Sequence, residues 1–168
     1  GLHRPEKINE HGILEHEPAF QKWNDHGIPT EQAWFKDGKV HRINGPSYLK
    51  WVIKDGNSIL IAQEYSREGQ NHRLGAPALQ HFNEQGIQID ELWSFNGKIH
   101  RDGDYPAEQI WNDRGQLLEQ RYWHNGLLHR VGAPANLVWN NQGILIEEKW
   151  GYLNRYHRSE SDKLPSHP

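Results

Sequence analysis

Hydrophobic and polar residues alternate along most of the chain with a period of two, and the alternation recurs roughly every 30 residues. Aligned on a recurring proline, the chain contains five similar units, over residues 18–42, 46–73, 77–101, 106–130 and 134–158. A period of two is typical of β-strands, whose successive side chains point to opposite faces. The pattern therefore predicts an all-β protein built from tandem β-hairpins.

The first predicted strand of each unit begins at the recurring proline, a residue that is tolerated at the start of a strand. Its alternate residues form columns across the five units, and each column has its own character. The columns are Ala19, Ser47, Ala78, Ala107 and Ala135; then Gln21, Leu49, Gln80, Gln109 and Leu137; then Trp23, Trp51, Phe82, Trp111 and Trp139. These columns place an aromatic side chain at the same position of every first strand.

The second predicted strand has an aromatic column and, two residues earlier, a polar column. The aromatic column is Trp34, Tyr65, Trp93, Tyr122 and Trp150, and the polar one is Gln32, Gln63, Glu91, Gln120 and Glu148. Two residues before the polar column comes a mostly aliphatic column of Thr30, Ile61, Ile89, Leu118 and Ile146, which we place on the same face.

Turn signals separate the predicted strands. An Asn-x-x-Gly sequence joins the two strands of most units, and Asp37-Gly38, Asn96-Gly97 and Asn125-Gly126 follow the second strand as strong hairpin signals. We therefore expect about ten to twelve strands in an elongated, twisted antiparallel sheet. A sheet this long is expected to coil, or to fold one end onto the other, to keep its tryptophans dry.

The repeats define one domain over residues 1–158, in which residues 1–17 form a shortened N-terminal cap, followed by a C-terminal tail over 159–168. Hydrophobic residues make up 35% of the 168 residues, yet 8 residues are tryptophan. A small apolar fraction concentrated in large flat rings suits a thin sheet better than a thick core.

An arginine recurs at one place in every unit, directly after a histidine, as Arg42, Arg73, Arg101, Arg130 and Arg158. The polar column of the second strand needs hydrogen-bond partners on an otherwise apolar face. A guanidinium supplies a planar fork of donors, so we predict that the arginines form a structural ladder that bonds this column. The alternative is an exposed arginine stripe that binds an acidic ligand. A residue required by every repeat favours the structural role.

The histidines that precede these arginines occur once per unit, as His41, His72, His100, His129 and His157. Neutral imidazole is a common metal ligand. One histidine per unit gives a line of rings rather than a tetrahedral cluster, so we expect no metal and no cofactor. Ring stacking or a bond to a turn carbonyl is the expected role.

One irregular feature suggests a binding surface. Trp123 is the one tryptophan outside the two aromatic columns, and Phe95 and Tyr152 lie near it in adjacent copies of the second strand. We predict that Phe95, Trp123 and Tyr152 form an exposed aromatic patch, because aromatic anchors are typical of interfaces. The competing interpretation is that the C-terminal tail covers this face.

Charge and motifs narrow the function classes. The net charge of −3 argues against binding nucleic acid through phosphate neutralisation and mildly favours a basic protein partner. The chain has no cysteine, no apolar run long enough to span a membrane, and no phosphate loop or nucleophile elbow. We therefore expect a non-enzymatic protein without a membrane partner, and we take a cytoplasmic location as the expectation.

The third unit carries a recognisable motif. The sequence Trp93-Ser94-Phe95-Asn96-Gly97-Lys98-Ile99-His100-Arg101, followed by Gly103 and Pro106-Ala107, resembles the W-x-x-N-G-K-x-H-R-x-x-G-P-A repeats of bacterial and phage proteins. Those repeats resemble the MORN-like repeats grouped with the YwqK-type antitoxin family. The resemblance implies a β-hairpin repeat fold and, for the antitoxin relatives, protein binding.

These observations predict a non-catalytic protein-binding module, of a toxin-neutralising, immunity or phage accessory type. Tryptophan, asparagine and glutamine also suit stacking and hydrogen bonding to sugars, so a carbohydrate- or surface-binding module is the alternative. A hydrolase with an unrecognised site is the third possibility.

Overall fold

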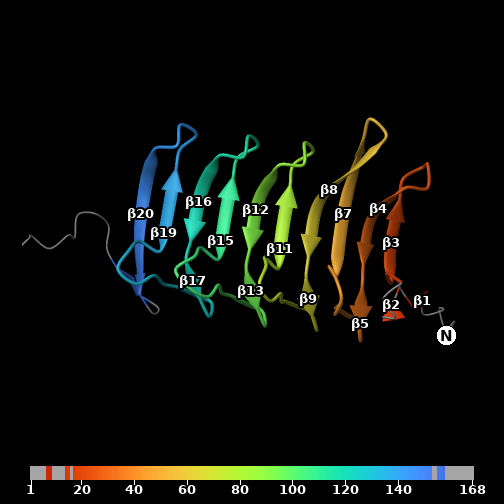
Figure 1. Cartoon of the computed structure of the whole chain (residues 1–168), viewed down its shortest axis with the longest axis horizontal. Coiled ribbons are helices and arrows are strands. Elements are labelled where there is room, and N and C mark those ends of the chain that lie inside the picture. The colour runs from red at the N-terminus through yellow and green to blue at the C-terminus, as the bar shows by residue number, and fades with distance from the viewer. Residues whose placement is uncertain (1–6, 9–13, 16, 153–154, 158–168) are drawn as a thin grey trace, which may run out of the picture.

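The computed structural model describes residues 7–8, 14–15, 17–152 and 155–157, and the side chains of residues 17–151. Within these ranges the chain consists of strands, turns and loops without a helix, which confirms the predicted all-β hairpin fold. Figure 1 shows the hairpins side by side along one axis, with the first and last units at opposite ends.

The main sheet has eleven strands that follow one another in sequence order, and every neighbouring pair is antiparallel. The strands are β3 (Phe20–Trp23), β4 (Pro29–Ala33), β7 (Tyr48–Lys54), β8 (Asn57–Glu64), β11 (Leu79–Phe82), β12 (Gln88–Leu92), β15 (Glu108–Trp111), β16 (Leu117–Arg121), β19 (Asn136–Trp139), β20 (Leu145–Tyr152) and β21 (Arg155–His157). Each predicted unit thus contributes one long hairpin.

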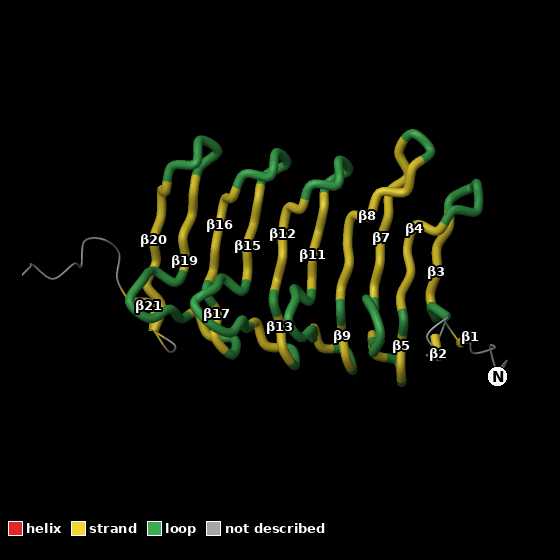
Figure 2. Tube along the Cα trace, in the orientation of Figure 1, coloured by secondary structure: helices red, strands yellow, loops and turns green. Residues whose placement is uncertain are grey.

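Short two-stranded hairpins follow the long ones along the lower edge of Figure 2. They pair β5 (Phe35–Lys36) with β6 (Lys39–Val40), β9 (Ser66–Arg67) with β10 (Gln70–Asn71), β13 (Ser94–Phe95) with β14 (Lys98–Ile99), and β17 (Trp123–His124) with β18 (Leu127–Leu128). Nearer the N-terminus, β1 (Lys7–Ile8) pairs with β2 (Leu14–Glu15). The rest of the predicted cap up to His16, and the predicted tail, lie outside the described residues.

The turns of the short hairpins have positive φ at both central residues, as type I′ turns require. Asp37, Asn96 and Asn125 have φ of 51°, 49° and 50°, and the glycine after each is also positive. Glu68-Gly69 forms the same turn, with φ of 52° and 80°. The sequence did not indicate this fourth turn, because glutamate is not a typical residue for positive φ.

The polar column of the second strands and the Gln21 column of the first strands form one row across the main sheet. Cross-strand partners give the order Gln21, Gln32, Leu49, Gln63, Gln80, Glu91, Gln109, Gln120, Leu137 and Glu148. Eight of these ten positions are glutamine or glutamate, so a row of polar side chains, interrupted by Leu49 and Leu137, runs across the main sheet. We call this set the glutamine row.

Every long hairpin contains a β-bulge at its aromatic residue. The register shifts immediately before Trp23, Trp51, Phe82, Trp111 and Trp139. The sequence predicts a mostly aliphatic column on the same face as the polar column of the second strand. In the structure these residues are the extra residues of the bulges and have no directly opposed partner: Thr30, Ile61, Ile89, Leu118 and Ile146. A bulge bends a strand and increases its twist, which an alternation pattern alone cannot reveal.

The buried interior is thin, as the composition suggested. Its hydrophobic members among the described side chains are small or aromatic: Ala33, Trp34, Ala62, Ala78, Ala107, Tyr122 and Ala135. The sheet does not fold one end onto the other, since the two ends lie far apart in Figure 2, and Trp23 is 54% exposed. Contacts between neighbouring units must therefore supply much of the stability.

Candidate functional site

Each described arginine of the ladder stacks on the aromatic ring that ends the long hairpin of its own unit. The guanidinium carbons of Arg42, Arg73, Arg101 and Arg130 lie 3.9, 3.7, 3.8 and 3.8 Å from the ring centres of Trp34, Tyr65, Trp93 and Tyr122. Their Nη1 atoms donate to the carbonyls of Pro46, Pro77, Pro106 and Pro134 at 3.0–3.5 Å. The side chain of Arg158 lies outside the described residues.

The shared partners of the arginines are thus an aromatic face and a proline carbonyl, rather than the polar column that we expected. Arg101 does approach that column, with Nη1 3.9 Å from Glu91 Oε1. The cation–π stack and the hydrogen bond to the proline carbonyl connect the loop after each short hairpin to the end of the long hairpin of the same unit. This geometry supports a structural role for the ladder.

Three members of the glutamine row, Gln63, Gln80 and Glu91, are joined through Gln88, which lies outside the row. Gln63 donates to Gln80 at 2.7 Å, Gln80 donates to Gln88 at 2.8 Å, and Gln88 donates to Glu91 at 3.0 Å. Trp93 Nε1 donates to the other oxygen of Glu91 at 3.1 Å. These hydrogen bonds join units two and three, so Gln63 and Glu91 of the polar column find partners in Gln80, Gln88 and Trp93.

The histidines of units one to three each link their unit to the next. The Nδ1 atoms of His41, His72 and His100 accept from the backbone N–H groups of Glu68, Asn96 and Asn125 at 3.0, 3.2 and 3.2 Å. These amides belong to the first residue of the following short-hairpin turn. The expected bond to a turn carbonyl is therefore a bond from a turn amide, because an unprotonated imidazole nitrogen is an acceptor.

Ring contacts accompany these bonds, as the sequence suggested. His72 lies 4.8 Å from Phe95 between ring centres, and His100 lies 4.7 Å from His124. His124 is also 6.5 Å from His129. The side chain of His157 lies outside the described residues, and within the described ones no group of His, Cys, Asp and Glu could hold a metal.

The loop between units three and four differs from the others. It has one more residue between arginine and proline, over Arg101 to Pro106. Asp104 reaches the next unit and accepts two hydrogen bonds from Arg130, 2.7 Å from Nε and 3.0 Å from Nη2. These bonds hold the pKa of the Asp104 carboxyl below its ordinary value. Tyr105 lies 5.1 Å from the Arg101 guanidinium carbon, measured to its ring centre.

A pocket of about 460 Å³ opens beside this loop. Its walls include Arg101, Tyr105, Trp123, His124, His129 and Arg130. The extra loop residue was visible in the sequence, but its reach to the arginine of the next unit was not. This pocket is the main irregularity of an otherwise repetitive surface.

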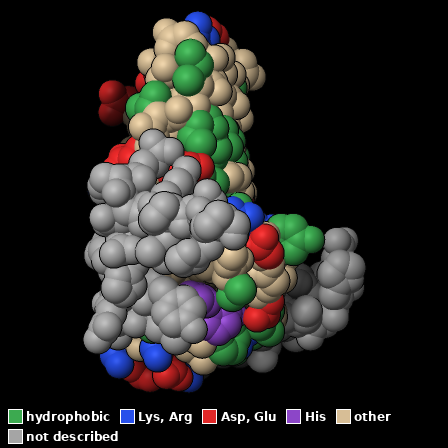
Figure 3. Space-filling view, turned by 90° about the vertical axis from the view of Figure 1, so that its left-hand side faces the viewer, with side chains coloured by type: hydrophobic (Ala, Val, Ile, Leu, Met, Phe, Trp, Pro, Cys, Tyr) green, Lys and Arg blue, Asp and Glu red, His purple; other side chains and the backbone are tan. Residues whose placement is uncertain are grey.

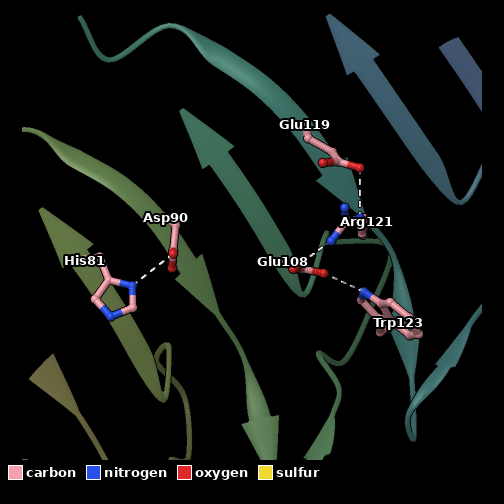
Figure 4. Close-up of polar contacts among 6 residues, drawn as sticks. All are labelled: His81, Asp90, Glu108, Glu119, Arg121 and Trp123. Carbon is pink, nitrogen blue, oxygen red and sulfur yellow. Dashed lines mark hydrogen bonds and ion pairs between the residues drawn. The ribbon is translucent and has the colours of Figure 1, made fainter. Parts of the chain in front are cut away.

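The structure places the three residues of the predicted aromatic patch in different surroundings. Trp123 Nε1 donates to Glu108 Oε2 at 3.0 Å, and Arg121 donates to the other oxygen of Glu108 at 2.9 Å, as Figure 4 shows. Phe95 is exposed and packs on His72. The side chain of Tyr152 lies outside the described residues. Phe95 and Trp123 occupy the second and first positions of their short strands, so alternation turns them to opposite faces.

Pairs of acidic and basic side chains occupy the sheet face opposite the glutamine row. His81 Nδ1 lies 2.9 Å from Asp90 Oδ2 (Figure 4), and this bond raises the pKa of His81. Lys22 donates to Glu31 at 2.8 Å, which lowers the pKa of that carboxyl. Burial, together with a hydrogen bond to Glu31, raises the pKa of Tyr48 to about 12.

A second hollow of about 430 Å³ lies on that face, with Tyr48, Lys50, Glu64 and His81 among its walls. Burial raises the pKa of the Glu64 carboxyl, and the nearby His81 moderates this effect. A carboxyl beside a lysine, a tyrosine and a histidine can bind polar groups. The hollow belongs to ordinary positions of unit two and its neighbours.

Exposed hydrophobic side chains follow the loops that connect the units. Ile43, Leu74 and Val131 come directly after the ladder arginines and are 67%, 72% and 81% exposed, and Tyr105 in the longer loop is 61% exposed. We call Ile43, Leu74, Tyr105 and Val131 the loop edge. The sequence offered a signal for it, an aliphatic residue after three of the His-Arg pairs.

The fold and these contacts define a tandem β-hairpin repeat protein with an open, single main sheet. No family model matches the chain, and no match was found among curated proteins or solved structures. None of the described residues forms a helix that is long and apolar enough to cross a membrane.

Proposed function

We propose that this chain is a non-catalytic repeat module that binds a protein partner through the loop edge. The observation that carries the proposal is the exposure of four large hydrophobic side chains, one in each of four consecutive loops. Single exposed hydrophobic residues are ordinary, but here one recurs in each of four successive loops, and exposed apolar surface on this scale marks an interaction site. Repetition gives the surface a length that suits a macromolecule.

The longer loop supplies the specific part of this surface. Asp104 and Tyr105 line the same pocket as Trp123 and His124, and Asp102 in the same loop is almost fully exposed. An aromatic anchor with acidic neighbours suits a partner that offers an apolar pocket and a basic rim. The net charge of −3 acts in the same direction.

The arginine and histidine columns support a non-catalytic role. Their polar groups make the same contacts in successive units, to a proline carbonyl or to a turn amide. Groups that hold neighbouring units together are poorly placed to act on a substrate. The motif resemblance to MORN-like repeats favours a toxin-neutralising, immunity or phage accessory role, with a cytoplasmic location.

The test uses cross-linked capture from cells of the source organism, followed by binding measurements with the purified candidate partner. The test variant is Ile43→Ser, Leu74→Ser, Tyr105→Ala and Val131→Ser combined. The control is Phe35→Ser, which removes an exposed hydrophobic residue of a short hairpin rather than of a connecting loop. We expect the test variant to bind at least about tenfold more weakly than the control. Equal binding by both variants contradicts the proposal.

A carbohydrate ligand is the second candidate, and the aromatic column of the first strands favours it. Trp23, Trp51, Phe82, Trp111 and Trp139 lie on alternate strands beside the glutamine row, so neighbouring rings are spaced by about 10 Å. Rings stack on sugars and carboxamides hydrogen-bond to hydroxyls. A glycan array in which Trp111→Ala with Trp139→Ala loses every signal would favour this candidate over the protein partner.

A further inference from the structure

The internal junctions between units share one register. Across the four junctions, the polar residue of a second strand lies opposite the residue of the glutamine row on the next first strand: Gln32 with Leu49, Gln63 with Gln80, Glu91 with Gln109 and Gln120 with Leu137. The residue before it and the residue after it pair in the same way each time. The second strand of each unit therefore pairs with the first strand of the next unit in one constant register.

The two ends of the main sheet present the two strand types that pair at such a junction, a second strand at one end and a first strand at the other. At one end β20 is a second strand, and within the described residues its outer edge pairs with β21 only at Trp150, Gly151 and Tyr152. At the other end β3 is a first strand, which among the described residues pairs only with β4. An unpaired strand edge is a template for another chain.

Applying the shared register to these ends gives complementary pairs. Glu147 would lie opposite Lys22 of another molecule, Glu148 opposite Gln21, and Lys149 opposite Phe20. The first pair repeats the internal pair of Glu31 with Lys50. Glu147 forms an ion pair with Lys149, and Lys22 forms one with Glu31. Both charges therefore already lie on the sheet face opposite the glutamine row.

The end at β20 is also apolar. Ile144, Leu145, Ile146 and Trp150 are exposed, and Figure 3, which views the molecule from this end, shows hydrophobic side chains on the narrow upper part. Few proteins leave a long apolar strand edge without charges that prevent pairing. Here the charges of the two ends attract.

We propose that the outer edge of β20 binds the outer edge of β3 of a second copy of this chain, so that the main sheet continues from one molecule into the next. The contact is heterologous, because two different surfaces meet. Such contacts extend into chains unless the rotation closes a ring. The binding surface of the loop edge would lengthen with each added copy.

Charge reversal at the two ends tests this junction by sedimentation velocity over a wide range of concentrations. We expect the full chain to associate, and Glu147→Lys and Lys22→Glu each to weaken association by about tenfold or more. An equimolar mixture of the two variants should associate again, because the lysine introduced in one molecule would then meet the glutamate introduced in the other. Asp113→Lys, in an exposed turn away from both ends, is the charge-matched control.

Circular dichroism and melting temperature of each variant show whether it folds, independently of association. The proposal is overturned if the full chain stays monomeric at every concentration. It is also overturned if both folded edge variants associate like the control, or if mixing them restores nothing. Pairing of β20 with a strand of a different protein would give the first of these results.

Discussion

The guanidinium carbon of Arg73 lies 3.7 Å from the centre of the Tyr65 ring, and Arg73 Nη1 donates to the Pro77 carbonyl at 3.1 Å. The arginine thus connects the end of one long hairpin to the start of the next. A thin sheet with little buried apolar surface depends on such repeated contacts between units.

Replacing Arg73 should reveal the energy of this connection. Arg73→Leu loses the cation–π stack and the charged hydrogen bond, so we expect the free energy of unfolding to fall by about 1–3 kcal/mol. Arg73→Lys should lose nearly as much, since an ammonium cannot stack as a flat fork. Urea denaturation measures both, with Arg67→Leu, an exposed arginine of a short hairpin, as the control. Equal losses for Arg73→Leu and Arg67→Leu would refute the structural role.

The histidine column makes a separate prediction. His72→Phe keeps an aromatic ring beside Phe95 but removes the Nδ1 acceptor of the Asn96 amide. We expect a loss of about 1 kcal/mol in the free energy of unfolding, because a hydrogen bond disappears. Amide exchange should also become faster at Asn96 than at its equivalents Glu68 and Asn125. Unchanged exchange at Asn96 would exclude this link between units.

The ion pair of His81 and Asp90 predicts a pH dependence. The pKa of His81 is raised from its ordinary value of 6.5, chiefly by the hydrogen bond to Asp90, while Glu64 faces it from the neighbouring strand. A raised pKa means that the folded state binds the proton more tightly, so the stabilisation is complete below the unfolded pKa and is lost as pH rises through the folded pKa.

The measurement compares the free energy of unfolding of the unmodified chain and His81→Asn at pH 5 and at pH 8. The unmodified chain should be more stable than the variant at pH 5, and the difference should shrink at pH 8. Asp90→Asn should remove the same pH-dependent difference. A gap between the two proteins that grows with pH has the wrong sign and would contradict the assignment.

Gly151 occupies a position where a side chain does not fit. A Cβ atom built there would lie 2.4 Å from the Leu128 carbonyl oxygen, which belongs to the backbone of the preceding unit. Gly151→Ala should therefore lower the free energy of unfolding by about 1–3 kcal/mol, because the last strand must move away. Gly143→Ala, in an exposed turn with a positive φ but open space around it, separates steric crowding from backbone strain. A Gly151→Ala protein as stable as the unmodified chain would mean that this approach is not required.

Much of the fold follows from the sequence, because strand alternation and turn chemistry are local. The Trp23 column falls in the expected strands, and the turns at Asp37-Gly38 and Asn96-Gly97 fall in the expected hairpins. The aromatic column of the second strand was expected inside that strand, whereas Trp34, Tyr65, Trp93 and Tyr122 lie in the single-residue break between the long strand and the short hairpin. The bulge before Trp23 escaped prediction, because its extra residue, Thr30, continues the alternation in sequence.

The partners of the polar residues were harder to predict, because they depend on packing between units. Arginine was expected to bond Glu91 and its equivalents, yet the acceptor that the arginines share is a proline carbonyl four or five residues along the chain. The pair of Asp104 and Arg130 joins residues of different units, which only the stacking distance brings together. Phe95 and Trp123 were grouped by position along the sequence, while strand alternation separates them.

The distance between the outer units tests the central claim, that five hairpins form one open sheet. The absence of cysteine allows paired spin labels at His26→Cys and Gln142→Cys, in the equivalent exposed turns of units one and five. Four units of two strands each should separate the labels by about 40 Å in a pulsed dipolar measurement. A distance below about half of this value would show that the sheet closes on itself, and would contradict the account.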